Sequence, residues 1–355
     1  MEVIAASGMS GAAPDQRAGF GVSVAPMMDW TDRHCRYFLR GFSPNVLLYT
    51  EMIVADALLR GNAERLLRHH ADEHPVALQL GGSEPHKLAA AARIGAAAGY
   101  DEINLNCGCP SDRVHAGAFG ACLLHEPARV GECIAAMTAV VNVPVTVKMR
   151  IGVIDGGDGL RDRVQAFDEP EWRVLHEFVN TVAAAGCRRV IVHARKAVLG
   201  GLSPEQNRAV PPLRYDIVRQ IKERWPDLAV ILNGGLRTVA QVAEARAWCD
   251  GVMLGREAYH RPYVLSELEE SLGRGDYARP SEVQVLERMG QYAEQELARG
   301  ERLSAIVRHM LGLCAGRPGA RDLRRELSEG ARENGAGAEL LHRVARRLAL
   351  QPQAV

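Results

Sequence analysis

Short runs of hydrophobic residues alternate along this chain with segments of helical periodicity. The runs are rich in Val, Ile and Leu and begin near residues 22, 47, 75, 102, 144, 189, 229 and 251. The intervening segments read as helices. One of them, 84–98, follows Ser83, is dense in alanine and stops at Gly99, which are helix start and stop signals. Eight strands alternating with helices predict a closed parallel (β/α)8 TIM barrel over residues 20–272.

Beyond about residue 275 the strand pattern ends and helical periodicity alone continues. We therefore expect a smaller all-helical domain over residues 273–355 and a flexible tail over 1–19. A doubly wound open sheet is the structural alternative, but it calls for G-x-G-x-x-G after the first strand, where this chain reads APMMDW. The segment 155–170 is rich in Gly and Asp and is predicted to be a solvated loop. A calcium site is disfavoured there because the ligand set is incomplete.

Composition describes an ordinary globular protein of 355 residues, with 47% hydrophobic and 24% charged residues and zero formal net charge. A nucleic-acid partner would therefore have to be met by a local patch. The N-terminus lacks the pattern of a secretory signal, and no run of about 18 apolar residues predicts a membrane span. We expect a cytoplasmic protein whose eight cysteines remain thiols.

Polar residues close every predicted strand, and in a TIM barrel these strand ends gather at one face. In chain order they are Met27 and Met28, Glu51, Gln79, Asn106 with Cys109, Lys148 with Arg150, His193 with Arg195, Asn233 to Gly235, and Gly255 with Arg256. The glycines and Arg256 follow strands seven and eight, where this fold commonly binds phosphate. Gln79, His193 and Lys148 are suited to contact a flavin ring, Lys148 by stabilising its reduced, anionic form.

Several motifs resemble those of the tRNA-dihydrouridine synthases, in particular the A subfamily, which acts on uridines 20 and 20a of the D-loop. The motifs span residues 22–335 and include VAPMMDWTDRHCR, DEINLNCGCPSDRV, PVTVKMRIG, GLSPEQNR, DGVMLGREAY and RHMLGL. The resemblance implies flavin mononucleotide (FMN) as cofactor, NADPH as electron donor and tRNA as substrate. It places FMN contacts at Pro26, Met27, Met28, Gln79, Lys148, His193, Asn233, Gly234, Gly235, Gly255 and Arg256.

The implied reaction needs a hydride at C6 of uracil and a proton at C5. A thiol can donate that proton because its usual pKa, about 8.5, keeps it protonated at neutral pH. The residues alone leave Cys107, Cys109 and Cys122 as candidates, and the resemblance selects Cys109, with Asn106 holding the uracil. The family usually has an aliphatic residue at position 107. We interpret Cys107 as a substitute for that residue and expect no metal, because structural zinc needs four ligands.

The chain from residue 300 onward has ten arginines and six acids, a modest basic bias that an ordinary solvated surface would also give. The resemblance implies tRNA contacts at Arg321 and Arg324 in the helical domain and at Glu205 and Arg208 in the barrel. We expect no stable protein partner and a monomer. Two alternatives stay open: an FMN barrel that reduces a small molecule, of the dihydroorotate dehydrogenase kind, and a non-catalytic RNA-binding barrel.

Overall fold

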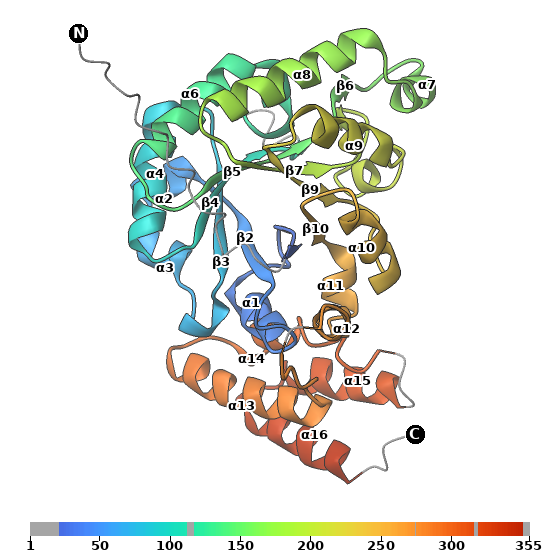
Figure 1. Cartoon of the computed structure of the whole chain (residues 1–355). Coiled ribbons are helices and arrows are strands. Elements are labelled where there is room, and N and C mark those ends of the chain that lie inside the picture. The colour runs from blue at the N-terminus through green and yellow to red at the C-terminus, as the bar shows by residue number, and fades with distance from the viewer. Residues whose placement is uncertain (1–20, 112–116, 274, 316–318, 351–355) are drawn as a thin grey trace, which may run out of the picture.

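Eight parallel strands close into a barrel in this computed structural model, which describes residues 21–111, 117–273, 275–315 and 319–350 (Figure 1). The strand order is β1-β10-β9-β7-β5-β4-β3-β2, so the eight predicted runs are the eight barrel strands. Their bounds are β1 Val22–Val24, β2 Leu47–Val54, β3 Val76–Gly81, β4 Glu102–Cys107, β5 Val145–Arg150, β7 Arg189–His193, β9 Ala229–Asn233 and β10 Gly251–Leu254. The predicted TIM barrel is confirmed.

Helices surround the barrel in the order that the sequence pattern predicts. They are α1 Arg33–Arg40, α2 Ala55–Arg60, α3 Ala63–Leu67, α4 Pro85–Ala97, α6 Pro127–Thr138, α8 Glu169–Ala184, α9 Tyr215–Arg224, α10 Val239–Arg246, α11 Arg256–His260 and α12 Tyr263–Ser271. The predicted helix at 84–98 is α4, and Gly99 follows it with φ +96°. The N-cap is Glu84 and not Ser83, and it makes no side-chain cap bond.

The segment 155–170 differs from the loop that its composition predicted. It contains the short helix α7 (Leu160–Gln165), and its Asp168 caps α8 by accepting the N–H of Glu171 at 3.0 Å. At the start of the segment, β6 (Val153–Asp155) pairs with β8 (Ala197–Leu199) in a two-stranded parallel sheet. These three-residue strands are too short to give a hydrophobic run that the sequence pattern could detect.

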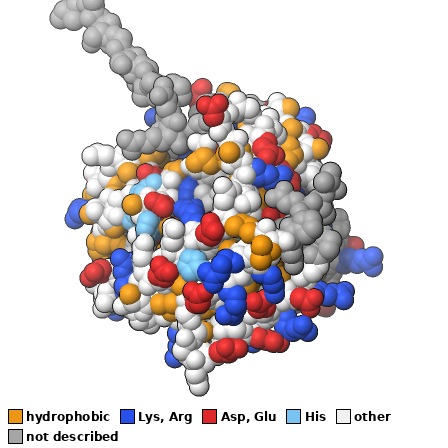
Figure 2. Space-filling model, turned by 90° about the horizontal axis from the view of Figure 1, so that it is seen from below, with side chains coloured by type: hydrophobic (Ala, Val, Ile, Leu, Met, Phe, Trp, Pro, Cys, Tyr) orange, Lys and Arg blue, Asp and Glu red, His pale blue; other side chains and the backbone are white. Residues whose placement is uncertain are grey.

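Below the barrel in Figure 1 lie α13 (Glu282–Ala298), α14 (Leu303–Val307), α15 (Ala320–Gly330) and α16 (Glu339–Ala349). All regular elements among the described residues after α12 are thus helices, as expected. Figure 2 views this helical region from below and shows Lys and Arg side chains beside acidic ones. The expected tail over residues 1–19 lies outside the described residues. No described helix is both long and apolar enough to cross a membrane.

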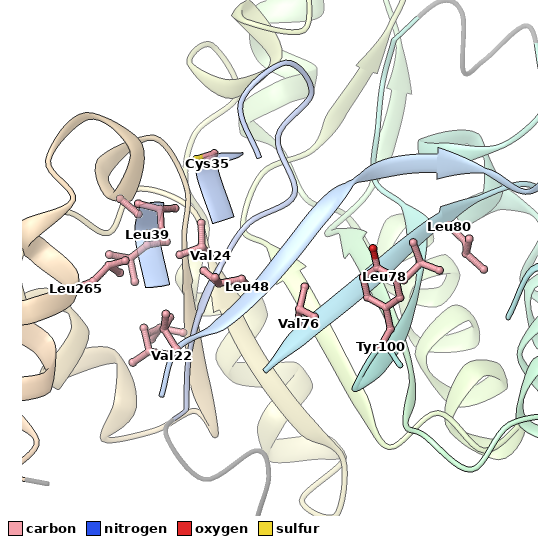
Figure 3. Packing of buried hydrophobic residues seen from close by; sticks show 14 of the residues in the cluster. Val22, Val24, Cys35, Leu39, Leu48, Val76, Leu78, Leu80, Tyr100 and Leu265 are labelled. Atoms are coloured by element: carbon pink, nitrogen blue, oxygen red, sulfur yellow. The ribbon is translucent and has the colours of Figure 1, made fainter. Parts of the chain in front are cut away.

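The hydrophobic core lies mainly between the strands and the surrounding helices. Alternate strand residues point outward into it, among them Val22 and Val24 of β1 and Leu78 of β3. In Figure 3 Val22 and Val24 lie near Leu39 of α1 and Leu265 of α12, whereas Leu78 lies beside Tyr100. The barrel interior holds a smaller apolar cluster of Ala25, Tyr49, Ala77, Ile191, Ile231 and Met253. The remaining inward positions are free for polar side chains.

A polar and aromatic junction joins the helical region to α1 of the barrel. Tyr292 of α13 stacks on Tyr37 of α1, with ring centroids 4.0 Å apart. One turn further along, the buried carboxylate of Glu296 pairs with Arg33 of α1 and, at 3.0 Å, with Arg68. These contacts cross between segments more than 220 residues apart in sequence.

A second part of the junction centres on Asp32, which caps α1 by accepting the N–H of Cys35. Its carboxylate also pairs with Arg308 at 2.6 Å and with the fully buried His309 at 3.0 Å. Although burial alone would raise its pKa, His309, Cys35 and Arg308 together hold the pKa of Asp32 well below its usual value. The same side chain therefore starts α1 and anchors the helical region.

Replacing Glu296 with Gln should weaken this junction in a pH-dependent way. Burial by itself raises the pKa of Glu296, but Arg33, Arg299 and Arg68 outweigh burial and lower it below its usual 4.5. The charged carboxylate therefore stabilises the fold above about pH 4.5, and this contribution is lost as the pH falls further. We expect a loss of about 2 kcal/mol in unfolding free energy at pH 7, shrinking at pH 3.5.

Urea unfolding at both pH values measures this difference. Glu294→Gln, an exposed position on the same helix paired with His342, is the matched control and should cost little. An equal loss for Glu296→Gln at the two pH values would contradict the assigned charge effect.

Candidate active site

The strand-end residues predicted from the sequence converge at the carboxyl-terminal mouth of the barrel. The register of the sheet pairs Asn106 of β4 with Lys148 of β5, and His193 of β7 with both Arg150 and Asn233. Parallel strands in register bring their carboxyl ends to one edge. Residues separated by more than 100 positions in the chain therefore share one surface.

Asn106 connects the mouth to the loop that carries Cys109. Its amide oxygen accepts the backbone N–H groups of Gly108 at 3.1 Å and Cys109 at 3.0 Å. Its amide nitrogen donates to Oε1 of Gln79 at 2.8 Å. Gln79 and Asn106 are both buried. The position of Cys109 is thus tied to the side chain that we expect to meet the flavin.

Among the three candidate cysteines Cys107 is buried, whereas Cys109 and Cys122 are both partly exposed and differ in their partners. Cys107 is the last residue of β4 and is fully buried, and burial raises its pKa well above its usual value. Cys122 donates to the carbonyl of Phe119 at 3.2 Å, and burial raises its pKa. Cys109 is partly exposed at the mouth, where its thiol lies 3.6 Å from the Ser111 hydroxyl. The outward, core-facing position of Cys107 agrees with its interpretation as a replacement for an aliphatic residue.

The described residues contain one group of side chains close enough to share a metal ion, namely His34, Glu296 and Glu301, and it lies at the junction rather than at the mouth. Arg33 already pairs with both of these glutamates. The guanidinium therefore supplies the positive charge that a metal would bring. We assign this group to the junction and to no metal.

Lys148 projects into the mouth and donates to Oδ1 of Asn233 at 3.1 Å. Burial, with a contribution from Arg150, lowers its pKa to about 7. Burial likewise lowers the pKa of His193 well below its usual value, helped by Arg150 and Lys148, so the imidazole is neutral at pH 7. These shifts describe a site with more positive charge than its own acids can balance.

Arg150 has a structural part in the same region. Its guanidinium donates to the carbonyls of Gly108 at 3.1 Å, Lys196 at 2.8 Å and Asn207 at 2.9 Å. The side chain of Asn207 in turn bonds both the N–H and the carbonyl of Val198. One buried guanidinium thus fixes the Cys109 loop and the loop that leads to Arg208.

Further arginines surround the mouth. Burial and the neighbouring Arg256 lower the pKa of both Arg195 and Arg208, while Glu205 opposes the effect at Arg208. Arg256 begins α11 directly after Gly255 and lies 3.5 Å from the carbonyl of Arg208. The predicted phosphate contact and the predicted barrel contacts to RNA are therefore neighbours.

Two glycines follow β9 because a side chain would not fit there. Gly234 and Gly235 have φ of +118° and +75°, and an added Cβ would approach Leu213 to 2.9 and 2.4 Å. Tyr215 fixes the turn by donating to the carbonyl of Gly234 at 2.6 Å. The backbone of this turn can therefore approach a ligand closely.

The segment after β1 completes the mouth with apolar surface. Pro26 and Met27 are partly buried, whereas Met28 is 56% exposed. Asp29, the next residue, has φ +63°, an uncommon conformation for a non-glycine residue that clusters at functional sites. Trp30 then stacks on Tyr259, with centroids 4.4 Å apart.

Arg321 and Arg324 lie on α15 with both side chains exposed, as their spacing of three predicts for one helix face. Nε of Arg324 donates to the carbonyl of Leu311 at 3.2 Å. The basic residues of α16 differ, because Arg343 and Arg347 pair with Glu326 of α15. The arginine count of this region therefore overstates its free positive charge, as the mixed surface in Figure 2 indicates.

The strand-end search missed three polar residues deeper in the barrel, Glu102, Asn104 and Thr146, all at most 2% exposed. Together with Gln79 and Asn106 they form one hydrogen-bonded chain. A signal for Glu102 and Asn104 exists in the run EINLNC, where polar residues at positions 102, 104 and 106 alternate with hydrophobic ones. That period of two places all three inside the barrel.

Comparison with known proteins gives a consistent match. The family model described as dihydrouridine synthase (Dus) matches residues 23–349. A protein of Xanthomonas campestris pv. campestris is 51% identical over 327 residues, covering 92% of this chain and 93% of its own. Proteins of Pseudomonas syringae pv. tomato and Synechocystis sp. are 52% and 49% identical, covering 86% and 90% of this chain and 87% and 92% of their own. All three are named tRNA-dihydrouridine(20/20a) synthase.

Replacing Lys148 with Met should change the stability of the ligand-free protein in a pH-dependent way. Below the folded pKa of about 7, Lys148 is charged in the folded and unfolded states, and folding must bury the charge. Between that pH and its usual pKa of 10.5 this free-energy cost of folding decreases as the pH rises, since Lys148 is neutral in the folded state. We expect Lys148→Met to gain most in Tm relative to wild type at pH 6.5 and least near pH 10.

Thermal melts of both proteins at pH 6.5, 8 and 10 measure the trend. Lys222→Met on α9, which removes a lysine paired with Asp250, is the control. A Tm difference for Lys148→Met that stays constant with pH would mean that no buried charge is relieved.

Proposed function

This chain belongs to the dihydrouridine synthase family, and from that premise we propose that it reduces uridine to 5,6-dihydrouridine in tRNA. The relatives' names point to positions 20 and 20a. The observation that carries the proposal is the convergence of Gln79, Asn106, Cys109 and Lys148 at one barrel mouth. An amide, a thiol and a cation at one mouth suit a reduction that consumes a hydride and a proton.

We propose FMN as the cofactor of this site. The residues fit an anionic group, because burial and repulsion from neighbouring arginines lower the pKa of Lys148, Arg195 and Arg208. Arg256 and the glycine turn after β9 would hold the phosphate, and Gln79, Lys148, His193 and Asn233 would contact the ring, with Pro26 to Met28 and Gly255 beside it. When bound and reduced, the flavin supplies the hydride for C6 of uracil.

The protein's own part in the reaction is to orient the uracil and to deliver a proton. Asn106 would hold the ring, and the Cys109 thiol would donate its proton to C5 from the face opposite the hydride. A carbanion-like C5 is a better base than a thiolate, so the transfer needs no further activation. Asn106 fixes the Cys109 N–H, which keeps the thiol beside the substrate it helps to hold.

NADPH is the proposed electron donor. The sequence contains no G-x-G-x-x-G fingerprint, so we expect the nicotinamide to react from the open mouth and then leave. Among partners we propose tRNA alone, with the chain acting as a monomer.

For tRNA binding we propose two contact areas. Glu205 and Arg208 are exposed beside the mouth, and Arg321 and Arg324 are exposed on α15. Uridine must leave its stack in the folded RNA to reach a flavin, which costs free energy that contacts outside the pocket can offset.

Two measurements test the proposed function. The purified protein should be yellow, with absorbance bands near about 375 and 450 nm from oxidised flavin. Dihydrouridine mapping of tRNA from cells with and without the gene should show loss at positions 20 and 20a. A colourless protein, or unchanged tRNA, would overturn the corresponding part of the proposal.

Cys109→Ala should retain flavin, and the flavin should still be reducible by NADPH, because the thiol lies outside the proposed ring contacts. Uridine reduction should slow by about 10²-fold, the usual contribution of a positioned general acid. Single-turnover oxidation of reduced enzyme by tRNA measures this rate. Cys122→Ala is the matched control and should turn over normally; a slow Cys122→Ala and a normal Cys109→Ala would transfer the role.

Arg321→Glu with Arg324→Glu should impair tRNA binding alone. Flavin content and NADPH oxidation without tRNA should stay normal, while affinity for tRNA falls and depends less steeply on salt, since fewer counterions are released. Binding at two salt concentrations measures both effects. Arg93→Glu with Arg173→Glu, exposed on α4 and α8 away from the helical region, makes the same change in net charge (Figure 1). Equal losses in the two double variants would assign the effect to net charge.

A further inference from the structure

A chain of buried hydrogen bonds runs inside the barrel from Glu102 to the Cys109 loop. The Thr146 hydroxyl donates to Glu102 at 2.6 Å and accepts from Nδ2 of Asn104 at 2.8 Å. Oδ1 of Asn104 accepts from Nε2 of Gln79 at 2.8 Å. From Gln79 the chain continues through Asn106 to the backbone of the Cys109 loop. We call this series the interior relay.

The two ends of the interior relay determine its direction. Glu102 pairs with Arg189 at 2.5 Å and can only accept, so Thr146 must donate to it. The single hydroxyl proton of Thr146 is then used, and Asn104 must present its amide nitrogen to the hydroxyl oxygen. At the other end the N–H groups of Gly108 and Cys109 can only donate, so Asn106 must present its oxygen to them.

The amides between these ends have no freedom to flip. A flip of Gln79 would set its nitrogen against the nitrogen of Asn106 and its oxygen against the oxygen of Asn104. Each such mismatch leaves buried donors and acceptors unsatisfied, at a cost of about 1–3 kcal/mol apiece. Gln79, Asn104 and Thr146 are 1%, 0% and 1% exposed, so water does not substitute readily. The orientation of Gln79 is therefore fixed from both sides, by Asn106 and, through three successive hydrogen bonds, by Glu102.

From this geometry we propose that Glu102, Thr146 and Asn104 are positioning residues for the reaction. They fix the amide orientation of Gln79, which accepts from Asn106 and so helps to hold Asn106 and the backbone that carries Cys109. The inference rests on the proposed function for the roles of Gln79 and Cys109. The structural part of the inference, the coupling of Thr146 to the Cys109 loop, does not depend on the identity of the cofactor.

Thr146→Val and Thr146→Ser are the matched pair that tests the interior relay. Valine keeps the shape of threonine but removes the hydroxyl, whereas serine keeps the hydroxyl. Hydrogen exchange measured by mass spectrometry on the protein as purified reports on the Gly108 and Cys109 amides. We expect exchange about tenfold faster in Thr146→Val and unchanged in Thr146→Ser.

Kinetics with tRNA give the second readout. We expect kcat to fall about tenfold in Thr146→Val with little change in KM for tRNA, because the misplaced groups act on the reacting ring rather than on RNA binding. Thr146→Ser should restore the rate. If Thr146→Val does not fold, Thr146→Cys replaces it, since a thiol is a weak donor and acceptor of similar size.

Tyr49→Phe controls for general loss of polarity in the barrel. It removes another hydroxyl that donates to Glu102, at a similar depth but off the path to Gln79. Exchange at Gly108 and Cys109 should stay normal in this variant. The proposal is overturned if Thr146→Val matches wild type, or if Tyr49→Phe accelerates exchange as much as Thr146→Val does. A wild-type protein without uridine reductase activity would refute the proposed function and leave the exchange comparison readable.

Discussion

Every polar side chain inside a closed barrel must find its hydrogen-bond partner inside the barrel, because the strands and their helices exclude water. In this barrel the buried polar side chains Gln79, Asn104, Asn106 and Thr146 come from the neighbouring strands β3, β4 and β5, whereas Ile191, Ile231 and Met253 of the interior apolar cluster come from β7, β9 and β10. The constraint is met by one directed series of hydrogen bonds that begins at an ion pair, Glu102 with Arg189, and ends on the loop that carries Cys109. The hydrogen bonds that pair the buried polar groups of the interior therefore also orient the side chains at the mouth.

The mouth differs from the interior, because its positive charges are not balanced by nearby acidic side chains. Lys148, His193 and Arg195 all have lowered pKa values because they are buried among other cations. Such an arrangement weakens the ligand-free fold and favours any anion that enters. The contrast with the junction is clear, where Arg33 meets two glutamates.

The sequence predicted the fold well because each barrel strand buries Val, Ile or Leu against the surrounding helices, which gives eight short hydrophobic runs separated by helical segments. It missed β6, β8 and α7, whose short lengths leave no periodicity to read. At the site, the strand-end rule located Gln79, Asn106, Lys148 and His193, but it looked only at the last residues of each strand. Thr146 and Asn104 lie lower, and their partners are set by register across strands, which a single chain does not display.

The basic character of the helical region illustrates another limit of the sequence. A count of arginines treats all ten alike, yet Arg343 and Arg347 form ion pairs with Glu326. Arg308 likewise forms an ion pair with Asp32. Only the folded arrangement distinguishes arginines that build the domain from arginines that face solvent.

Asp32 carries a consequence for the reach of the enzyme. Because it caps α1 and binds Arg308 and His309 at once, the helical region is fixed directly to the start of α1. The connection between α12 and α13 is fixed to the barrel as well, because the Tyr277 hydroxyl donates to the carbonyl of Phe42 at 2.7 Å. The distance between α15 and the barrel mouth is therefore set by side-chain contacts with the barrel at several points, and this distance is the span that a bound RNA has to match.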